Sequence, residues 1–305
     1  MKIYLNNLNE NWIVDRFKSE WYKFNKDIST RFYLNADIIW IIAPWTFKNK
    51  DLIKFKNKKI VCTIHHFENI DVKKEFDEKY SEIDNYVTAY HVISNYTYEH
   101  LKKLTDKPIF NRPFWVNQNT FFDIQETEKI KNYFKFNKAD FLIGTFQRDS
   151  DGRDLNKPKL IKGPDRFIEI VKKMHKLNPN LKVVLTGTRR NYIKNELKNN
   201  LIPFYLFEMS NSKNLNYLYN CLNLYIVSSR IEGGPQSIME CAITKTPIIS
   251  TDVGFAKQFL APESIFNMSN FETAKPNVEF AYKKVSEFTL NENMNYFRNF
   301  FSDLL

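Results

Sequence analysis

The stretch from Leu222 to Glu240, LNLYIVSSRIEGGPQSIME, decides the fold class of this chain. It begins with an apolar run of the length and composition of a buried strand, passes through small and polar residues, and reaches Gly233-Gly234-Pro235. Proline suits the first turn of a helix, so the stretch predicts a strand, a tight loop and a helix beginning at Pro235. Such strand-loop-helix units build parallel α/β sheets.

The same alternation of short apolar runs and amphipathic stretches continues along the whole chain, which indicates an α/β fold with helices on both faces of parallel sheets. Predicted strands of the first half are Lys2 to Leu5, Asp37 to Ile42, Lys59 to Ile64, Ala89 to Ile93 and Pro108 to Phe110. Those of the second half are Asp140 to Phe146, Lys182 to Thr186, Pro203 to Phe207, Leu222 to Val227, Pro247 to Ser250 and Ser264 to Phe266. Clear helices are expected at Asn95 to Leu104, capped by Ser94, and at Arg166 to Met174.

A charged stretch from Asp123 to Lys138 separates the two halves. We therefore predict an N-terminal domain over 1–122, a second domain over 123–285 and a terminal helical segment over 286–305. Two facing α/β halves would leave a cleft lined by the carboxyl ends of strands, where ligands of such sheets bind. We expect the functional site in that cleft.

Composition narrows the class of protein. A chain of 305 residues with 43% hydrophobic residues can bury a substantial core. Cys62, Cys221 and Cys241 lie in apolar segments without metal or redox spacing, so we expect buried thiols. The longest apolar run, Ala36 to Pro44, is too short to span a bilayer, and the first residues lack the pattern of a signal peptide. A cytoplasmic location is expected.

The formal net charge of +10 raises two hypotheses about partners. Six lysines between Lys48 and Lys59 predict a peripheral contact with an anionic membrane, with a solvated face as the alternative. The charge and the 16% aromatic content also suggest a nucleic-acid-binding module. However, aromatics such as Phe167, Phe207 and Tyr225 occupy strand or helix positions typical of a core, and we expect no nucleic-acid partner.

The loop and helix start after the 222–227 strand carry the chemistry. Exposed N–H groups from Gly234 through Gln236 and Ser237 would attract a phosphate, and the glycines allow close approach of a ligand. Two carboxylates so near a phosphate need neutral partners, and sugar hydroxyls are suitable. We therefore expect Glu240 to bind ribose and Glu232 to bind a sugar; the alternative is two glutamates that merely face solvent.

This stretch resembles the paired-glutamate signature of retaining glycosyltransferases of the GT-B fold, especially family 4 (glycosyl transferases group 1), in which seven residues separate the two glutamates. Gly233 and Gly234 match the family's small residues, and TPIISTDVG from Thr246 to Gly254 is similar to its next strand and turn. The resemblance covers most of the second half. It implies two Rossmann-like domains with the first one shortened, and a nucleotide-sugar donor, UDP- or GDP-linked above all.

Two cations upstream also match the family. Arg148 follows a strand and Lys162 precedes a helix, at the positions where the family holds the donor diphosphate. Fixed cations there stabilise the charge that develops on the departing nucleotide, so no metal or other cofactor is expected. The polar insertion from Asp149 to Leu160 adds Arg153 as a second candidate for the diphosphate. Its acidic residues resemble a calcium loop, but its glycine comes too early for one.

In the first half, His65 and His66 follow the 59–64 strand. Family members often keep a histidine there, so the resemblance implies that one of them, His65 by preference, faces the donor sugar. The first domain of the family selects the acceptor, here expected to be a glycan, a lipid-linked compound or another hydroxyl compound. The terminal segment is expected to pack back on this domain.

One alternative keeps the fold and changes the role. A GT-B relative could epimerise a sugar nucleotide or act as a non-catalytic subunit, and the short first half motivates this hypothesis. A dehydrogenase is disfavoured, because no Gly-x-Gly-x-x-Gly follows the first strand of either half.

Overall fold

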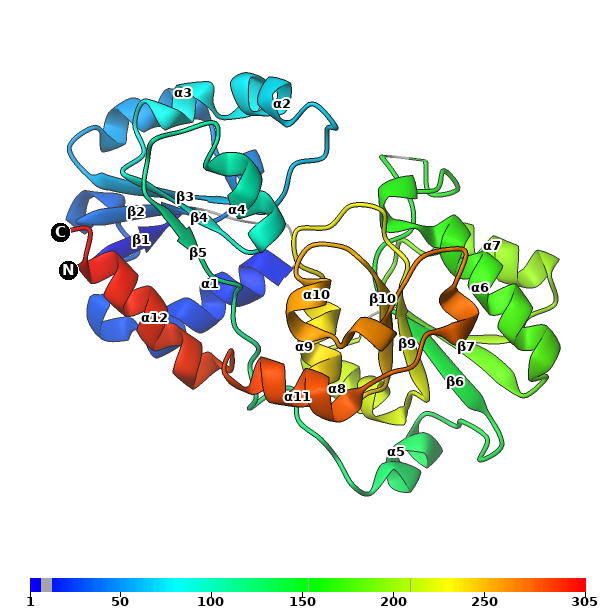
Figure 1. The fold of residues 1–305 in the computed structure, drawn as a ribbon. Coiled ribbons are helices and arrows are strands. Elements are labelled where there is room, and N and C mark those ends of the chain that lie inside the picture. Colours follow the sequence, from blue (N-terminus) through cyan, green and yellow to red (C-terminus); the bar gives the residue numbers. More distant parts are fainter. Residues whose placement is uncertain (7–12, 153, 209) are drawn as a thin grey trace. The chain divides into compact units, whose positions relative to one another are not determined.

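The computed structural model describes residues 1–6, 13–152, 154–208 and 210–305. The chain forms two compact units, one of Met1–Phe114 with Asn291–Leu305 and the other of Trp115–Leu290, called unit 1 and unit 2 below. Each unit contains a parallel sheet and helices, so the predicted α/β class is confirmed (Figure 1). The chain passes from one unit to the other after Phe114 and again after Leu290. The predicted limits of separate domains, at 122 and 285, stay a prediction.

Unit 1 contains a five-stranded sheet in the order β1-β2-β3-β4-β5, with every neighbouring pair parallel. The strands are β1 (Ile3–Leu5), β2 (Ile38–Ile41), β3 (Lys59–Ile64), β4 (Ala89–Val92) and β5 (Ile109–Asn111). The helices are α1 (Ile13–Phe24), α2 (Val72–Lys79), α3 (Ser81–Asp84), α4 (Asn95–Leu101) and α12 (Leu290–Ser302), with 3₁₀ turns η1 (Lys26–Ile28), η2 (Tyr33–Asn35), η3 (Pro44–Thr46) and η4 (Asn49–Phe55).

Aromatic residues join the two ends of the chain in the core of unit 1. Trp40 on β2 is fully buried, and its ring lies 5.3 Å from that of Trp21 on α1 and 5.1 Å from that of Phe301 on α12. Buried aromatic rings remove large apolar areas from water, and Phe301 contributes one of them. Helix α12 is therefore part of this core. Outside the core, Arg298 of α12 pairs with Asp27.

Unit 2 contains a six-stranded parallel sheet in the order β11-β10-β9-β6-β7-β8. The strands are β6 (Phe141–Thr145), β7 (Leu181–Thr186), β8 (Phe204–Phe207), β9 (Leu224–Val227), β10 (Ile248–Thr251) and β11 (Ile265–Phe266). The helices are α5 (Thr127–Tyr133), α6 (Pro164–Leu177), α7 (Asn191–Asn199), α8 (Ser212–Cys221), α9 (Gln236–Ile243), α10 (Ala256–Phe259) and α11 (Val278–Ser286), with 3₁₀ turns η5 (Leu160–Lys162), η6 (Pro262–Ser264) and η7 (Phe271–Thr273).

The order of the strands in unit 2 reverses between β6 and β9. From β6 the chain builds the sheet toward β7 and β8, and it then returns to place β9 on the other side of β6. In open parallel sheets, ligands bind outside the carboxyl ends of the strands at such a reversal. The topology therefore points to the loops that follow β6 and β9.

The predicted elements agree closely with the observed ones. Every predicted strand is present with ends shifted by no more than about two residues, a normal uncertainty for element ends. The predicted cap is confirmed, because the Ser94 hydroxyl accepts a hydrogen bond from the Thr97 N–H at the start of α4. All three cysteines are buried thiols, as predicted. One detail was wrong: α9 begins at Gln236, and Pro235 precedes it in an extended conformation.

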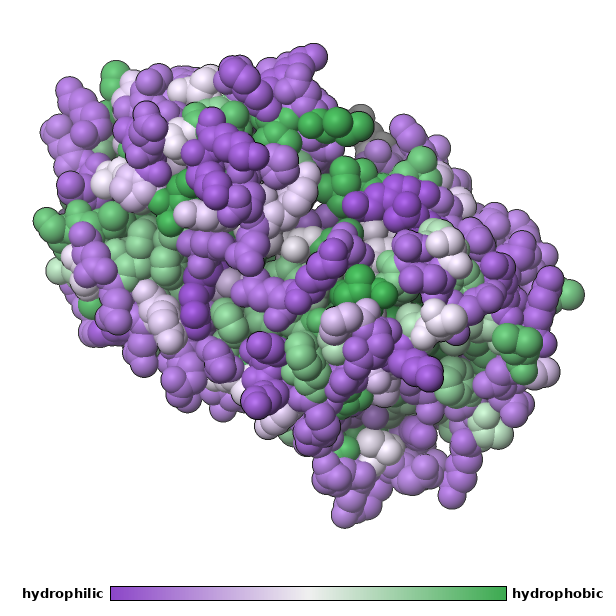
Figure 2. All heavy atoms as spheres, viewed as in Figure 1, coloured by the Kyte–Doolittle hydropathy of each residue, from purple (hydrophilic) through white to green (hydrophobic). Residues whose placement is uncertain are grey.

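Hydrophilic residues cover most of the face in view in Figure 2, with hydrophobic residues scattered among them. The aromatics used to argue against nucleic-acid binding are inside unit 2: Phe167 and Tyr225 are buried, and Phe207 packs against the core. Within the described ranges, no helix is long and apolar enough to cross a membrane.

Candidate functional site

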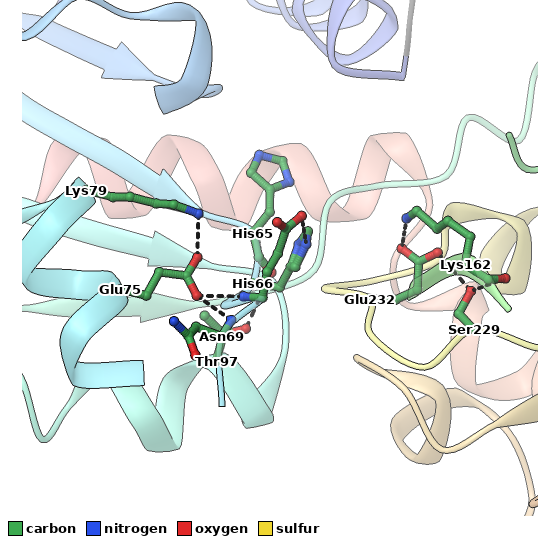
Figure 3. A network of polar contacts seen from close by, with 10 residues as sticks. His65, His66, Asn69, Glu75, Lys79, Thr97, Lys162, Ser229 and Glu232 are labelled. Carbon is green, nitrogen blue, oxygen red and sulfur yellow. Dashed lines mark hydrogen bonds and ion pairs between the residues drawn. The ribbon is translucent and has the colours of Figure 1, made fainter. Parts of the chain in front are cut away.

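The centre of the candidate site is an ion pair between Lys162, at the end of η5, and Glu232, in the loop between β9 and α9. Lys162 Nζ lies 2.5 Å from Glu232 Oε2, and the two side chains are only 14% and 10% exposed. Figure 3 shows the two side chains directed toward each other. The fold therefore brings together a cation and a carboxylate that the sequence predicted to act on the same ligand.

Ser229 and Gln147 support this pair with hydrogen bonds. The Ser229 hydroxyl lies 3.1 Å from Glu232 Oε1 (Figure 3). It also lies 3.2 Å from Gln147 Oε1. Gln147 Nε2 donates to the carbonyl oxygen of Lys162 at 2.7 Å. Gln147 follows β6 and Ser229 follows β9, so the loops at the strand-order reversal are linked through polar side chains. Neither residue was singled out from the sequence.

Close contacts between backbones explain two of the glycines around the pair. Gly163 adopts φ +63°, and a Cβ there would lie 1.9 Å from the carbonyl oxygen of Ser228. Gly254 adopts φ +53°, and a Cβ there would lie 2.2 Å from the carbonyl oxygen of Gly233. Only glycine combines this left-handed backbone with such a close approach. The loop after β9 is thus held between the start of α6 and the turn after β10.

Gly234 has a role that the sequence did not indicate. We expected it to admit a ligand, but a Cβ at this position would lie 2.2 Å from the ring of Phe255. The side chain of the following Gln236 donates to the carbonyl oxygen of Trp115 at 3.0 Å. Ser237 is the next residue of α9. Burial raises the pKa of Tyr225, and hydrogen bonding with Ser237 opposes that shift.

Glu240, the second glutamate of the pair, is 4% exposed on α9. Its Oε2 accepts a hydrogen bond of 2.7 Å from the hydroxyl of Tyr219 on α8. Burial, and then the charge of Glu240, raise the pKa of Tyr219 well above its ordinary value, so this tyrosine stays a donor at physiological pH. The structure therefore adds Tyr219 as a residue that orients Glu240.

The other predicted cations are placed differently. Arg148 follows Gln147 and is exposed to solvent. Arg153 lies outside the described residues. Lys162 is consequently the one of these three predicted cations whose interactions the structure defines.

Arg190, which follows β7, is a site residue that the sequence did not reveal. It is 1% exposed, and its Nη1 donates to the carbonyl oxygen of Gln147, the residue before Arg148. Its Nε lies 3.6 Å from Oδ2 of Asp149, which is also buried and accepts from the N–H of Ile193 at 3.0 Å. Burial raises the pKa of Asp149, while the charge of Arg190 acts in the opposite direction. This buried pair fixes the backbone on both sides of Arg148.

In the acidic loop, Asp149 pairs with Arg190, and a β-bridge joins Ser150 and Pro158. Across the described parts of the chain, no group of three or more His, Cys, Asp or Glu residues could hold a metal ion.

Unit 1 holds the two predicted histidines after β3. His65 Nε2 lies 2.8 Å from the carbonyl oxygen of Ile42, so this nitrogen carries the proton and Nδ1 is left as an acceptor. Burial lowers the pKa of His65 to about 4, although the hydrogen bond to Ile42 opposes the change. The imidazole is therefore neutral at physiological pH. His66 instead pairs with Glu68 at 3.5 Å.

Glu75 on α2 fixes the segment that follows these histidines. It is buried, and its Oε2 accepts hydrogen bonds of 2.7 Å from the N–H groups of Glu68 and Asn69 (Figure 3). Lys79 pairs with its other oxygen at 2.7 Å. The loop after β3 is thus held by a charged residue of the next helix, a contact that no sequence motif indicated.

Part of the sequence, most of it in unit 2, matches a family model. Residues 158–297 match the model of the family described as Glycosyl transferases group 1. This range contains Lys162, Glu232 and Glu240, and it excludes Arg148 and the histidines of unit 1. No curated protein matches the chain in a sequence search.

Solved structures show the same fold along nearly the whole chain. The Anabaena protein HepE in complex with UDP-glucose aligns with a TM-score of 0.72 at 11% identity, over 99% of each chain. Sucrose-phosphate synthase from Thermosynechococcus elongatus aligns at 0.67 and 14% identity, over 95% of this chain and 77% of that one. A glycosyltransferase from Rickettsia africae aligns at 0.66 and 17% identity, over 98% and 84%.

Proposed function

We propose that this protein transfers a sugar from a nucleotide sugar to a hydroxyl acceptor with retention of configuration, because residues 158–297 match the model of the group 1 glycosyl transferases and the chain has the GT-B fold expected from the resemblance. Unit 2 binds the donor and unit 1 contributes the acceptor side. The observation that carries the proposal is the Lys162–Glu232 pair at the strand-order reversal of unit 2. The HepE structure was obtained with UDP-glucose, which supports a UDP-sugar as the first donor to test; a GDP-sugar is the second.

The predicted donor-site residues divide the ligand among them in this proposal, with Gly233 and Pro235 shaping the loop that leads to the helix. Lys162 and Arg148 neutralise the donor diphosphate, with Arg153 as a further cation. The N–H groups around Gly234, Gln236 and Ser237 contribute hydrogen bonds at the helix start. Glu232 binds hydroxyls of the sugar, and Glu240 binds ribose, oriented by Tyr219.

The reaction needs no nucleophile from the protein in this proposal. The bond between the sugar C1 and the diphosphate oxygen breaks, and its electron pair stays on the leaving diphosphate. The acceptor oxygen bonds to C1 on the same face, and its proton passes to the leaving phosphate oxygen. Lys162 and Arg148 stabilise the negative charge as it develops, so the cations lower the barrier without a metal.

The ion pair gives donor binding a defined first step. Lys162 Nζ is held by Glu232 at 2.5 Å in a site with little solvent exposure, where charges interact more strongly than in water. A diphosphate competes with Glu232 for Lys162, and sugar hydroxyls then replace the ammonium group at Glu232. Both partners of the pair exchange one charged contact for a ligand contact, so neither is left buried and unpaired.

His65 is proposed to lie near the transferred sugar, with His66 as the alternative. A neutral imidazole suits hydrogen bonding with hydroxyl groups better than a buried cation would, and the low pKa of His65 keeps it neutral. The acceptor is a glycan, a lipid-linked compound or another hydroxyl compound.

A peripheral contact with the inner face of a membrane is a further part of the proposal. Lysines of the 48–59 segment lie within and beside the turn η4, whose Ile53 is 64% exposed. Lys58 donates to the backbone of the exposed Leu34. Exposed apolar side chains among lysines suit an anionic lipid surface. The protein would then act in the cytoplasm at the membrane surface.

The test is turnover of UDP-glucose and GDP-mannose, measured as release of free nucleotide with and without acceptor. We expect Glu232→Ala and Lys162→Ala to lower kcat/KM by about 100-fold or more, and Glu240→Ala to raise the donor KM chiefly. Analysis of the anomeric configuration of the first product by NMR tests retention.

Glu169→Ala and Lys172→Ala are matched controls, because both residues are exposed on α6 and change the charge of the same unit equally. They are expected to keep wild-type turnover. Full turnover in the three site variants would refute the site. Nucleotide-sugar binding without turnover with any acceptor would favour a non-catalytic subunit, and interconversion of two sugar nucleotides would favour an epimerase.

A further inference from the structure

Unit 1 has a surface pocket that the proposed function does not use. It has a volume of about 440 Å³ and is formed by one side of α1, the turn after it and Arg31. Asp15, Ser19, Tyr22 and Lys26 line it at spacings of three to four residues, with Lys18 and Lys23 between them. Asp15, Ser19 and Tyr22 share one face of α1, and Lys26 lies in η1 just after that helix.

Positive charge in this pocket exceeds negative charge. Lys18, Lys23, Lys26 and Arg31 line it together with a single carboxylate, that of Asp15. In the ranges that the structure describes, Lys23, Lys26 and Arg31 form no ion pair. Like charges gathered in a concave surface repel one another, and a bound anion removes that repulsion.

Lys18 is partly buried beside the pocket, and the charge of Arg31 reaches it. Its Nζ donates to the carbonyl oxygen of Asn6 at 2.8 Å, which holds the ammonium group beside the pocket. Burial lowers the pKa of Lys18; Asp15 opposes the change, and the charge of Arg31 lowers the pKa further. The position of Lys18 is therefore fixed while its charge is destabilised.

Tyr22 supplies a rigid wall. Its hydroxyl donates to the carbonyl oxygen of Thr30 at 3.0 Å and accepts from the N–H of Leu5 at 3.2 Å. The guanidinium of Arg31 lies 5.1 Å from the ring centroid and Lys18 Nζ lies 6.0 Å from it. The ring thus holds two of the cations near it through cation–π attraction.

We propose that this pocket of unit 1 binds a phosphate ester, with Lys23, Lys26 and Arg31 contacting the phosphate and the Ser19 hydroxyl donating a hydrogen bond. Arginine and lysine together suit a multiply charged phosphate, because the guanidinium can bind two oxygens and the ammonium groups add point charges. The volume leaves room for the organic part of the ester beside Tyr22. The proposal does not depend on the proposed transferase activity, since none of these residues belongs to the donor site.

The first test is calorimetric titration with inorganic pyrophosphate. All proteins carry Lys162→Ala, so that the proposed diphosphate site of unit 2 contributes little. The pocket variant adds Lys23→Ala, Lys26→Ala and Arg31→Ala. Its matched control adds Lys172→Ala, Lys176→Ala and Lys198→Ala, which remove the same charge from exposed positions of unit 2. We expect at least tenfold weaker binding in the pocket variant and less than a twofold change in the control; equal affinity in the two overturns the proposal.

A single substitution tests the same pocket with little risk to folding, because Ser19 is exposed. Ser19→Glu places a carboxylate among the cations, where it competes with the phosphate and pairs with Lys23 one turn along α1. We expect at least tenfold weaker pyrophosphate binding without a lower melting temperature. Ser19→Gln has the same size and no charge, and is expected to stay within about threefold of the parent. Equal affinities for Ser19→Glu and Ser19→Gln contradict the proposal.

Vesicles identify the source of the phosphate. Phosphatidylcholine vesicles with and without phosphatidylglycerol are sedimented with the pocket variant and its control. Loss of binding to the anionic vesicles in the pocket variant only, with competition by pyrophosphate in the control, assigns the pocket to a lipid headgroup. Equal vesicle binding together with different pyrophosphate affinity assigns it to a soluble phosphate ester.

Discussion

At the scale of single residues, Arg190 holds the backbone of Gln147 and so the backbone from which the Arg148 side chain extends. Its guanidinium is buried, donates to the Gln147 carbonyl oxygen and lies beside Asp149. The side chain of Gln147 in turn holds the carbonyl oxygen of Lys162. Arg190 therefore acts as a positioning residue through Gln147, and it needs no contact with the ligand to influence both proposed diphosphate cations.

We predict that Arg190→Met lowers stability and donor binding together. Removing one partner of a buried ion pair costs about 3 to 5 kcal/mol, because Asp149 is left uncompensated. Loss of the hydrogen bond to Gln147 is expected to raise the donor KM about tenfold. Urea unfolding measures the first effect and steady-state kinetics the second.

The double variant Arg190→Met with Asp149→Asn separates the two effects. It removes the uncompensated charge and keeps an acceptor for the N–H of Ile193, so stability recovers while the donor KM stays high. Arg189→Met, a partly exposed neighbour, is the control. Recovery of both stability and KM in the double variant would show that Arg190 has only a structural role.

The sequence identified the charged residues of the site better than their neighbours. Glu232 was selected from its strand-loop-helix stretch and Lys162 from the resemblance to the family, and the structure pairs them across 70 positions. Arg190 and Gln147 are 43 positions apart and follow different strands without a motif. Their contact depends on the order of β6 and β7 in the sheet, which no local pattern contains.

At the scale of elements, the start of α6 controls the geometry of Lys162. Gly163 ends η5, precedes α6 and touches the backbone of Ser228 after β9. The Ser228 hydroxyl also donates to the carbonyl oxygen of Gly163 at 2.8 Å. Two elements from opposite sides of the strand-order reversal therefore meet at one glycine.

We predict that Gly163→Ala destabilises unit 2 by about 3 kcal/mol or more. The new Cβ would lie 1.9 Å from a carbonyl oxygen, and the left-handed backbone is unfavourable for alanine. Donor affinity is expected to fall as well, because Lys162 moves with the displaced loop. Chemical unfolding and nucleotide binding measure the two effects.

Gly152→Ala is the matched control. Gly152 has a similar φ of +54°, but a Cβ there meets no atom within 4 Å. Its cost is expected to be about 1 kcal/mol, from backbone conformation alone. Similar losses in the two variants would mean that the contact with Ser228 is easily relieved.

Strands were easier to predict than the irregular elements. Buried parallel strands are short apolar runs bounded by polar residues, and β3 from Lys59 to Ile64 was predicted with both ends correct. The lysine-rich segment folds as the 3₁₀ helix η4, held by packing of Leu52 and Phe55. The spacing of its polar residues did not predict this helix, because a 3₁₀ helix has neither the period of an α-helix nor that of a strand.

At the scale of the whole molecule, acid should weaken unit 1 through its buried histidines. Burial lowers the pKa of His65 to about 4 and that of His91, which bonds to Thr63 and the carbonyl oxygen of Arg112, to about 3. In the unfolded chain both titrate near about 6.5. The unfolded state therefore binds more protons below that pH, so the stability of unit 1 is complete above it and falls as the pH drops toward 4.

We predict a loss of up to about 1.4 kcal/mol per pH unit, the limit for one proton, for each of these histidines between pH 6 and pH 4. Urea unfolding of unit 1, followed by tryptophan fluorescence at several pH values, measures the slope. His91→Gln keeps a donor and an acceptor but cannot ionise, so its slope should be roughly half that of the wild type. Identical slopes would show that His91 does not contribute.

The return of the chain to unit 1 at Asn291 affects the order in which the protein folds during translation. Nascent chains usually complete their N-terminal domain first. Here the core around Trp40 lacks Phe301 until after all of Trp115–Leu290 has been made. Unit 2 can therefore mature while unit 1 still lacks α12, and a chain that stops before Asn291 would have a complete second unit and an unfinished first one.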